Sequence, residues 1–236
     1  MPYRTGQRLP LDGLPLRLSI NPRARRISIR IDGRAGEAVL VVPSERRVDQ
    51  GLAFARSRRA WIGERLRARP DGLRLEPGAT VPVLGRPVRL VATGGASAAR
   101  FAEADGEPAI LSGGEDEAFG RRVVNLLKRE AKARLVDRTE VHRLALGQAP
   151  VTVSIGDPKS RWGSCSPHNR SIRYSWRIVM APAEVLDYLA AHEVAHLVRP
   201  DHSPAFWQVV ERLIGDPRHH RAWLRAHGAE LHGVQS

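Results

Sequence analysis

Two histidines four residues apart, His192 and His196, restrict the fold of the chain more than any other feature. The segment from Pro182 to Leu197 is expected to be helical, because Pro182 suits a first turn and apolar residues follow at helical spacing. Side chains four apart on a helix lie on one face, about 6 Å from each other. That separation suits two imidazoles bound to one tetrahedral zinc ion. The sequence therefore predicts a zinc site built on this helix.

Glu193 directly follows the first of these histidines. From that position on the helix its side chain is expected to point toward the open coordination position of the zinc ion. A carboxylate there can act as general base on a zinc-activated water and then as general acid toward the leaving amine. The motif therefore predicts a hydrolytic reaction with Glu193 as its catalytic residue.

The third ligand is predicted from the turn that follows the helix. Arg199 precedes Pro200, which disfavours helical geometry at Arg199, so the chain is expected to turn there and return His202 toward the metal. Ser203 and Pro204 then have the residue types that open a new helix. Glu211 on that new helix is the rival ligand, but it lies roughly 100° or more from the centre of the helix's apolar stripe. The local geometry favours His202.

The bulk composition is that of a soluble globular protein with an excess of base. The chain has 236 residues and a formal net charge of +13, and only three of its basic residues are lysines. A field of this sign favours polyanions, so nucleic acid is a candidate partner. No apolar run reaches the roughly 18 residues of a membrane span, and no secretory signal is visible at the amino terminus. With Cys165 as the only cysteine, these features predict a cytoplasmic location.

Hydrophobic periodicity predicts an α+β fold in two parts. A β-rich amino-terminal region with one long helix is expected over residues 1–114, and a catalytic part with an HExxH active-site helix over residues 115–236. Residues 94–117 are rich in Gly, Ala, Ser and acid and are expected to form a loose connection. No internal repeat is visible. The expected strands span residues 14–20, 25–31, 38–42, 80–84, 87–93, 151–155 and 171–178, and the expected helices span 48–69 and 115–138, followed by the terminal helices.

The motifs of the catalytic half resemble those of the YgjP-like metallopeptidases, relatives of the SprT-type zincins. The resemblance includes the two histidines with Glu193, then His202-Ser203-x-x-Phe206-Trp207, and the upstream run Lys159-Ser160-Arg161-Trp162-Gly163-Ser164-Cys165-Ser166. It implies a zincin-like catalytic half and zinc-dependent hydrolysis. It also implies that a strand from the hairpin between residues 151 and 178 runs along the cleft and pairs with an extended substrate. The substrate-binding residues expected on this basis are Arg161, Trp162, Gly163, Ser164 and Tyr174.

Several roles stay open at this stage. Trp162 and Cys165 could equally pack against the active-site helix. A donor is also needed for the oxyanion that forms on the scissile carbonyl. Sequence does not choose among the candidate donors Tyr174, Arg161, His219 and His220.

The sequence thus predicts a zinc-dependent metallopeptidase that cleaves peptide or protein substrates, with Glu193 as general base. The alternative is a basic nucleic-acid-associated module with a structural zinc, in which Cys165 would be the fourth ligand. A third possibility, suggested by the SprT-type resemblance, is a protease that acts on DNA-bound proteins. The arginines would then bind DNA, and the zinc would serve in catalysis.

Overall fold

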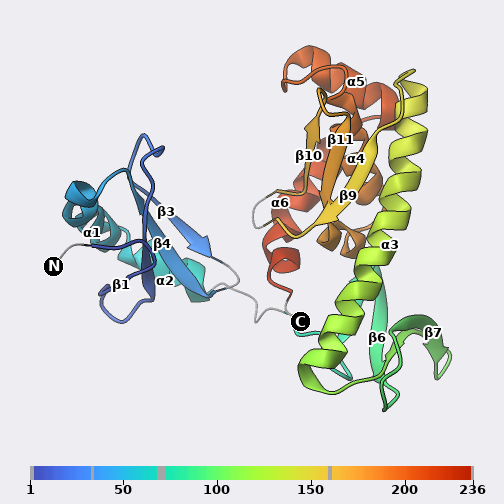
Figure 1. Ribbon diagram of the computed structural model, residues 1–236, viewed down its shortest axis with the longest axis horizontal. Helices are drawn as coiled ribbons and strands as arrows, with labels where there is room; N and C mark the ends of the chain where they lie inside the picture. The colour runs from blue at the N-terminus through green and yellow to red at the C-terminus, as the bar shows by residue number, and fades with distance from the viewer. Residues whose placement is uncertain (1–2, 33–34, 68–72, 159–160, 235–236) are drawn as a thin grey trace. The chain divides into compact units, whose positions relative to one another are not determined.

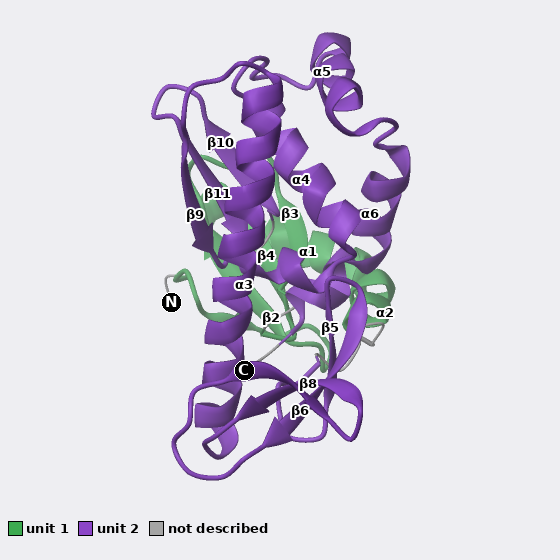
Figure 2. Cartoon of the chain, turned by 90° about the vertical axis from the view of Figure 1, so that its right-hand side faces the viewer, with its two compact units in different colours: residues 1–72 green, residues 73–236 purple. Residues whose placement is uncertain are grey.

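The computed structural model describes residues 3–32, 35–67, 73–158 and 161–234. The chain divides into two compact units, residues 1–72 and 73–236, which are drawn in Figure 1 and coloured separately in Figure 2. Each unit combines sheets with helices, so the expected α+β class is confirmed. Lys159 and Ser160, which begin the upstream motif, lie outside the described residues. No helix in the described ranges is long and apolar enough to cross a membrane.

Unit 1 is a four-stranded sheet with two helices packed against it. Its strands are β1 (Arg8–Leu9), β2 (Leu16–Ile20), β3 (Ser28–Asp32) and β4 (Glu37–Val42), in the order β1-β2-β4-β3. β2 and β4 run parallel, and the two outer pairs are antiparallel. The short 3₁₀ helix η1 (Glu45–Arg47) leads into α1 (Val48–Ser57) and α2 (Arg59–Arg67). β3 is an edge strand, because among the described strands only β4 pairs with it.

The core of unit 1 lies between the sheet and the helices. Leu18 of β2 and Leu40 of β4 are fully buried and belong to one core with Val48 of α1. Gly51 allows the close approach of α1, because a Cβ there would lie 2.9 Å from Val42 Cγ1. The single helix expected over residues 48–69 is two helices, since the backbone leaves helical geometry at Arg58 (φ −105°).

Unit 2 begins with a second four-stranded sheet, which the sequence predicted only in part. Its strands are β5 (Thr80–Val83), β6 (Arg86–Ala92), β7 (Arg100–Ala104) and β8 (Glu107–Ser112), in the order β5-β6-β8-β7. The expectation of a loose connection over residues 94–117 was wrong, because β7 and β8 form a hairpin there. β6 and β8 run parallel, and the outer pairs are antiparallel. This is the strand order and direction of the unit 1 sheet, although the two sequences show no repeat.

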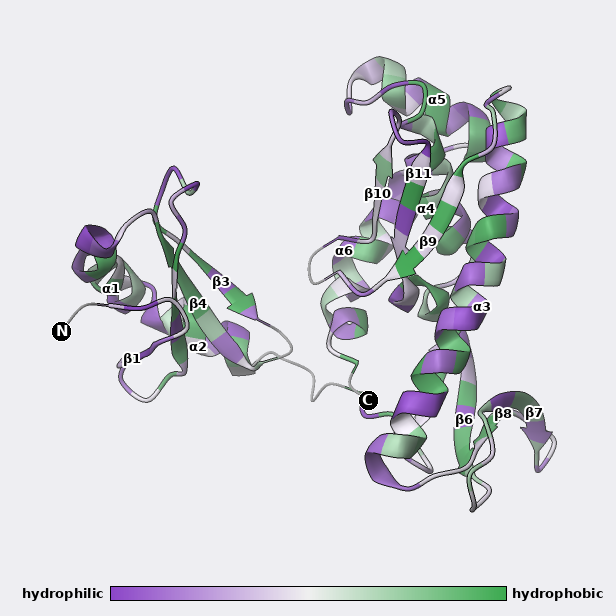
Figure 3. Cartoon of the chain, in the orientation of Figure 1, coloured by the Kyte–Doolittle hydropathy of each residue, from purple (hydrophilic) through white to green (hydrophobic). Residues whose placement is uncertain are grey.

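The 30-residue helix α3 (Asp116–Ala145) joins this sheet to the rest of unit 2. Its buried stripe includes the positions predicted from periodicity, Phe119, Val123, Leu127 and Leu135, and polar residues alternate with this stripe along the helix (Figure 3). The helix contacts β8 as well as the later strand β9 and helix α4. For this reason the compact units divide at residues 72 and 73, whereas the sequence placed the boundary at residues 114 and 115.

The remainder of unit 2 is a three-stranded sheet followed by three helices. The sheet has the order β10-β11-β9, with β9 (Thr152–Gly156) parallel and β10 (Gly163–Ser166) antiparallel to β11 (Ser171–Ser175). The 3₁₀ helix η2 (Trp176–Met180) leads into α4 (Ala183–Ala195), α5 (Pro204–Ile214) and α6 (Arg218–His232). One continuous core joins β11, η2 and α4 to α3 and the second sheet.

Candidate metal centre

The structure brings His192, His196 and His202 together at the end of α4. His192 lies in the last turn of the helix, and His196 caps it with helical backbone angles (φ −65°, ψ −17°). The chain then turns, and His202 lies in the loop before α5. One ring nitrogen from each histidine lies within 4.8 Å of the other two, and the Nε2 atoms of His192 and His202 are 3.2 Å apart.

This nitrogen set fits a metal ion. Two nitrogens bonded to one tetrahedral zinc ion at about 2.0–2.1 Å lie about 3.3 Å apart, close to the separation seen here between His192 and His202. The rings also favour the neutral form that a metal needs. Burial, and then the neighbouring histidines, lower the pKa of His192 to about 3. Burial also lowers the pKa of His196. Imidazole ligands of this kind suit zinc among the common divalent metals.

The outward-facing ring nitrogens of two histidines have hydrogen-bond partners. His196 Nδ1 lies 3.1 Å from the carbonyl oxygen of Arg199 and can donate a proton to it. The hydroxyl oxygen of Tyr188 lies 3.5 Å from His192 Nδ1, where it can accept the Nδ1 proton. In both rings the lone pair on Nε2 is then free to bind a metal ion. Partners of this type orient metal-binding histidines in known sites.

An aromatic platform from α5 lies against the three imidazoles. The fully buried Phe206 ring stacks on His196 at 4.5 Å between centroids and lies within 5.0 Å of the other two rings. Trp207 contacts His192 and His202, and the Arg221 guanidinium of α6 lies over its ring at 4.1 Å. The predicted start of α5 at Pro204 after Ser203 is confirmed. The platform explains how an exposed loop can hold His202 near the helix.

Glu193 follows His192 on α4 and is buried, with 4% of its surface exposed. Burial raises the pKa of its carboxyl to about 8. Its carboxyl lies against Gly163, the first residue of β10. A Cβ placed on Gly163 would lie 2.7 Å from Glu193 Cδ, so only glycine leaves room for the carboxyl. The tryptophan-glycine-serine-cysteine motif is thus adjacent to Glu193.

β10 is an edge strand of its sheet, because it pairs with β11 alone among the described strands. Gly163 and Ser164 lie on it and are partly exposed, and Arg161 just before it is exposed. Trp162 packs away from the strand, with its ring 4.3 Å from that of His232 on α6. The sequence treated this segment as a loop and missed the strand.

Tyr174 pairs with Gly163 across the sheet, but its side chain does not share the surface with the other expected substrate-binding residues. Its side chain is fully buried in β11, and its hydroxyl lies 2.9 Å from Thr139 Oγ1 of α3. The strand's alternation directs it into the core, so Tyr174 presents no surface to a substrate. Among the other candidates for an oxyanion donor, His219 is exposed, whereas His220 stacks on Tyr188 at 5.7 Å. The buried Nδ1 of His220 has no hydrogen-bond partner among the described residues.

The two rival ligands do not join the histidines. Within the described ranges, the group of metal-binding atoms around His192 contains histidines only, so neither Glu211 nor Cys165 belongs to it. Burial, and then the nearby Glu193 carboxylate, raise the pKa of Cys165 to about 12, so its thiol stays protonated at neutral pH. Sequence reasoning missed Tyr188, although its spacing of four residues from His192 on a helix was available as a signal.

Comparison with known proteins identifies the family. The model of the YgjP-like family, metallopeptidase domain, matches residues 25–227. The chain belongs to the YgjP-like family. A solved structure titled "Crystal structure of the metallopeptidase zymogen of Pyrococcus abyssi abylysin" is similar at 26% sequence identity, with 44% of this chain and 92% of that chain covered and a TM-score of 0.32. Among curated proteins, none matches the chain significantly.

Membership assigns an enzyme class to this YgjP-like chain. It is a hydrolase of the metallopeptidase type, so its substrates are peptides or proteins and its chemistry involves a metal ion. The matched residues include the whole of α4 and the three clustered histidines, and also most of unit 1.

Proposed function

We propose that this YgjP-like chain is a zinc-dependent peptidase in which His192, His196 and His202 hold the zinc ion and Glu193 is the general base. The observation that carries the proposal is the clustering of three histidine nitrogens within 4.8 Å beside a buried carboxyl group. A zinc ion bound there would polarise the scissile carbonyl and lower the pKa of a water toward about 7.

The chain's own residues would perform the remaining work. Glu193 would accept the water's proton and then protonate the leaving amine. Its raised pKa in the absence of metal follows from burial, and a cation held by the histidines would lower that pKa again, because an opposite charge favours the carboxylate. Buried surroundings also strengthen the electrostatic effect of the groups that face the substrate. His220 is the side chain we favour as oxyanion donor, because it lies on Tyr188 next to the histidines.

We further propose that the substrate binds as an extended strand along β10. The edge of β10 offers backbone N–H and C=O groups to an extended peptide. Gly163 and Ser164 on the strand, with Arg161 before it, would then flank the scissile bond, whereas Trp162 packs against α6. Because Gly163 touches the Glu193 carboxyl, a peptide paired with β10 would pass close to the general base.

The function is tested on the purified full chain with a pool of unbiased peptides, followed by mass spectrometry of the products. We expect about one zinc per chain by elemental analysis. We also expect cleavage that stops when a chelator removes the metal and returns when zinc is added back. A chain that binds no zinc after reconstitution, or that cleaves equally well with and without chelator, would contradict the proposal.

Replacing Gly163 with alanine should lower peptide cleavage while the zinc content stays near one per chain. The new Cβ would overlap the Glu193 carboxyl, and a displacement of a catalytic group by about 1 Å costs on the order of 100-fold in rate. We expect a loss of about 10–100-fold in kcat. Gly228→Ala is the matched control, because a Cβ there meets its nearest neighbour, Trp162, at 3.4 Å. Equal activities of the two variants would contradict the proposed contact between Gly163 of β10 and the general base Glu193.

Replacing Tyr188 with phenylalanine should weaken zinc binding by about 10-fold, within the range seen for partners of metal-binding histidines. The variant removes the acceptor for the His192 Nδ1 proton and leaves the ring in place. Tyr174→Phe is the control, since it deletes a hydroxyl that bonds to Thr139 in the core. Competition with a chromophoric chelator measures both affinities. A Tyr188 variant that binds zinc as tightly as the Tyr174 variant would show that the hydroxyl does not orient His192.

A further inference from the structure

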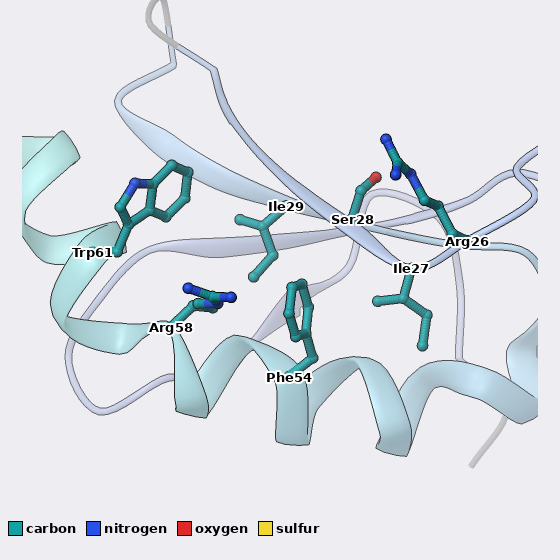
Figure 4. A pocket seen from close by; sticks show the side chains of 7 residues that line it. All are labelled: Arg26, Ile27, Ser28, Ile29, Phe54, Arg58 and Trp61. Carbon is teal, nitrogen blue, oxygen red and sulfur yellow. The ribbon is translucent and has the colours of Figure 1, made fainter.

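A groove in unit 1 lies far along the chain from the histidine cluster and has no role in the proposed reaction. It has a volume of about 400 Å³ and lies between the edge strand β3, with the residues just before it, and helices α1 and α2. Ile27 and Ile29 face Phe54 and Arg58 across it, and Trp61 borders one end (Figure 4). Phe54 and Trp61 remain 36% and 39% exposed. The unit thus leaves a set of large apolar side chains open to solvent.

The strand that borders the groove has an unpaired edge. β3 pairs with β4 on one side, from Ser28 opposite Val41 to Asp32 opposite Glu37. No other described strand pairs with its outer side. Unpaired backbone groups of an edge strand can accept an extended peptide as an additional strand. The apolar side chains of that peptide would then enter the groove beside Ile27 and Ile29.

The two charged residues that line the groove, Arg26 and Arg58, are both arginines. Residues 1–72 contain 16 arginines, no lysine and seven acidic residues, so this unit carries most of the chain's excess positive charge. No acidic side chain lines the groove. Arg26 points away from the apolar side of the strand, together with Ser28 (Figure 4). The exposed Arg30 follows the same alternation. Acidic residues at every second position of an added strand would lie next to these arginines.

We propose that unit 1 binds an extended protein segment in which apolar residues alternate with acidic ones, added to the outer edge of β3. The apolar residues enter the groove lined by Ile27, Ile29, Phe54 and Trp61. The acidic residues face Arg26 and Arg30. Recruitment of a protein substrate by this site rests on the proposed peptidase function, whereas the binding itself does not.

A single-stranded nucleic acid is the other polyanion that this surface could meet. Bases bind such surfaces by stacking on free aromatic faces. Here the Arg58 guanidinium already lies over the Phe54 ring, 5.8 Å from its centroid, and the strand side of the groove is aliphatic. The open edge of β3 also offers alternating backbone N–H and C=O groups. An extended peptide can form hydrogen bonds with all of them, whereas a nucleic acid backbone cannot. The observations favour the peptide.

The test is fluorescence anisotropy with the full chain and a fluorescein-labelled nine-residue peptide that alternates glutamate with valine. A second probe has lysine in place of every glutamate. We expect the glutamate probe to bind at least about 10-fold more tightly at low ionic strength, where surface charges are least screened. Trp61→Ala should weaken that binding about 10-fold. Equal binding of the two probes, or an unchanged affinity in the Trp61 variant, would overturn the proposal.

A double charge reversal gives a sharper result. Arg26→Glu combined with Arg30→Glu should reverse the preference, so that the lysine probe binds more tightly than the glutamate probe. The matched control reverses two exposed arginines of the second sheet, Arg86→Glu with Arg100→Glu, and should keep the wild-type preference. Circular dichroism melting shows whether each variant is folded. If the control reverses the preference equally, overall charge explains the binding and the proposed site is excluded.

Two further measurements separate the alternatives. A twelve-residue oligothymidine that displaces the glutamate probe and binds more tightly than it would overturn the peptide proposal in favour of nucleic acid. Binding of the glutamate probe to Glu193→Gln should equal that of the wild type. A chain that binds the probe but cleaves no peptide would therefore support the groove and contradict only the proposed peptidase function.

Discussion

Replacement of Glu193 with glutamine is expected to reduce peptide hydrolysis by about 10³-fold or more while the zinc content stays near one per chain. Glutamine keeps the shape of the buried side chain but cannot accept the water's proton. General acid–base groups contribute on the order of 10²–10⁴-fold, and here one group would serve both steps. The measurement is kcat on a peptide identified from the pool, with elemental analysis of the same samples.

The matched control is Glu184→Gln, which makes the same change at an exposed position in the first turn of the same helix. It should leave kcat within about twofold, because an exposed carboxylate near a helix start contributes little beyond local stability. Similar activities of the two variants would eliminate Glu193 as general base. Loss of zinc in the Glu193 variant alone would instead assign it a role in holding the site together.

The same substitution should also stabilise the metal-free protein at high pH. Burial raises the pKa of Glu193 from 4.5 to about 8. Ionisation is then easier in the unfolded chain, so the raised pKa lowers stability progressively as pH rises from about 4.5 through about 8. Glutamine removes this pH-dependent cost. The melting temperature of the Glu193 variant should match that of the wild type near pH 4.5 and exceed it near pH 9. The corresponding difference in the free energy of unfolding near pH 9 is on the order of 3–5 kcal/mol. The same difference in melting temperature between the two proteins at both pH values would contradict the claim that burial raises the pKa of Glu193.

The fold was predictable where hydrophobic spacing is local and strong. The stripe of Phe119 and Val123 identified α3, and the alternation from Arg26 to Ile31 identified β3. β7 and β8 were missed because the segment that contains them is rich in Gly, Ala, Ser and acid, and because pairing defines them: β8 pairs with β6, and β7 pairs with β8. The turn between them, Asp105-Gly106, has positive φ at both residues. That dipeptide is a strong hairpin signal, and it would have predicted these strands.

The candidate site divides in the same way. His192 and His196 follow from the geometry of one helix, and the turn at Pro200 predicts where His202 returns. The position of Gly163 against Glu193 depends instead on how β10 packs against α4, which no spacing within either segment records. β10 itself reads as Gly-Ser-Cys-Ser and carries no strand signal, so only its pairing with β11 defines it. The burial of Tyr174 follows from the same sheet, and the sequence could not distinguish it from the exposed residues of the motif.

Removal of the third ligand by His202→Ala is the second large effect we expect. Partners that only orient metal ligands account for about 10–100-fold in affinity, so loss of a ligand should weaken zinc binding by at least about 100-fold. Because His202 is exposed, the metal-free variant should melt at the wild-type temperature. The stabilisation that zinc gives, about 2.7 kcal/mol at a free concentration 100 times the Kd, should then disappear at zinc concentrations that saturate the wild type.

The control is His168→Ala, which removes an exposed histidine outside the cluster and should leave zinc affinity unchanged. Chelator competition gives the affinities, and melting with and without zinc gives the linked stabilities. If His202→Ala keeps wild-type affinity, the third ligand lies elsewhere, and Glu211→Gln and Cys165→Ser are the variants that would then lose the metal. If all three variants keep it, two histidines alone hold the ion and the proposed tetrahedral site is excluded. A selective loss in His202→Ala would show that the loop after Pro200, held against Phe206, completes the metal centre.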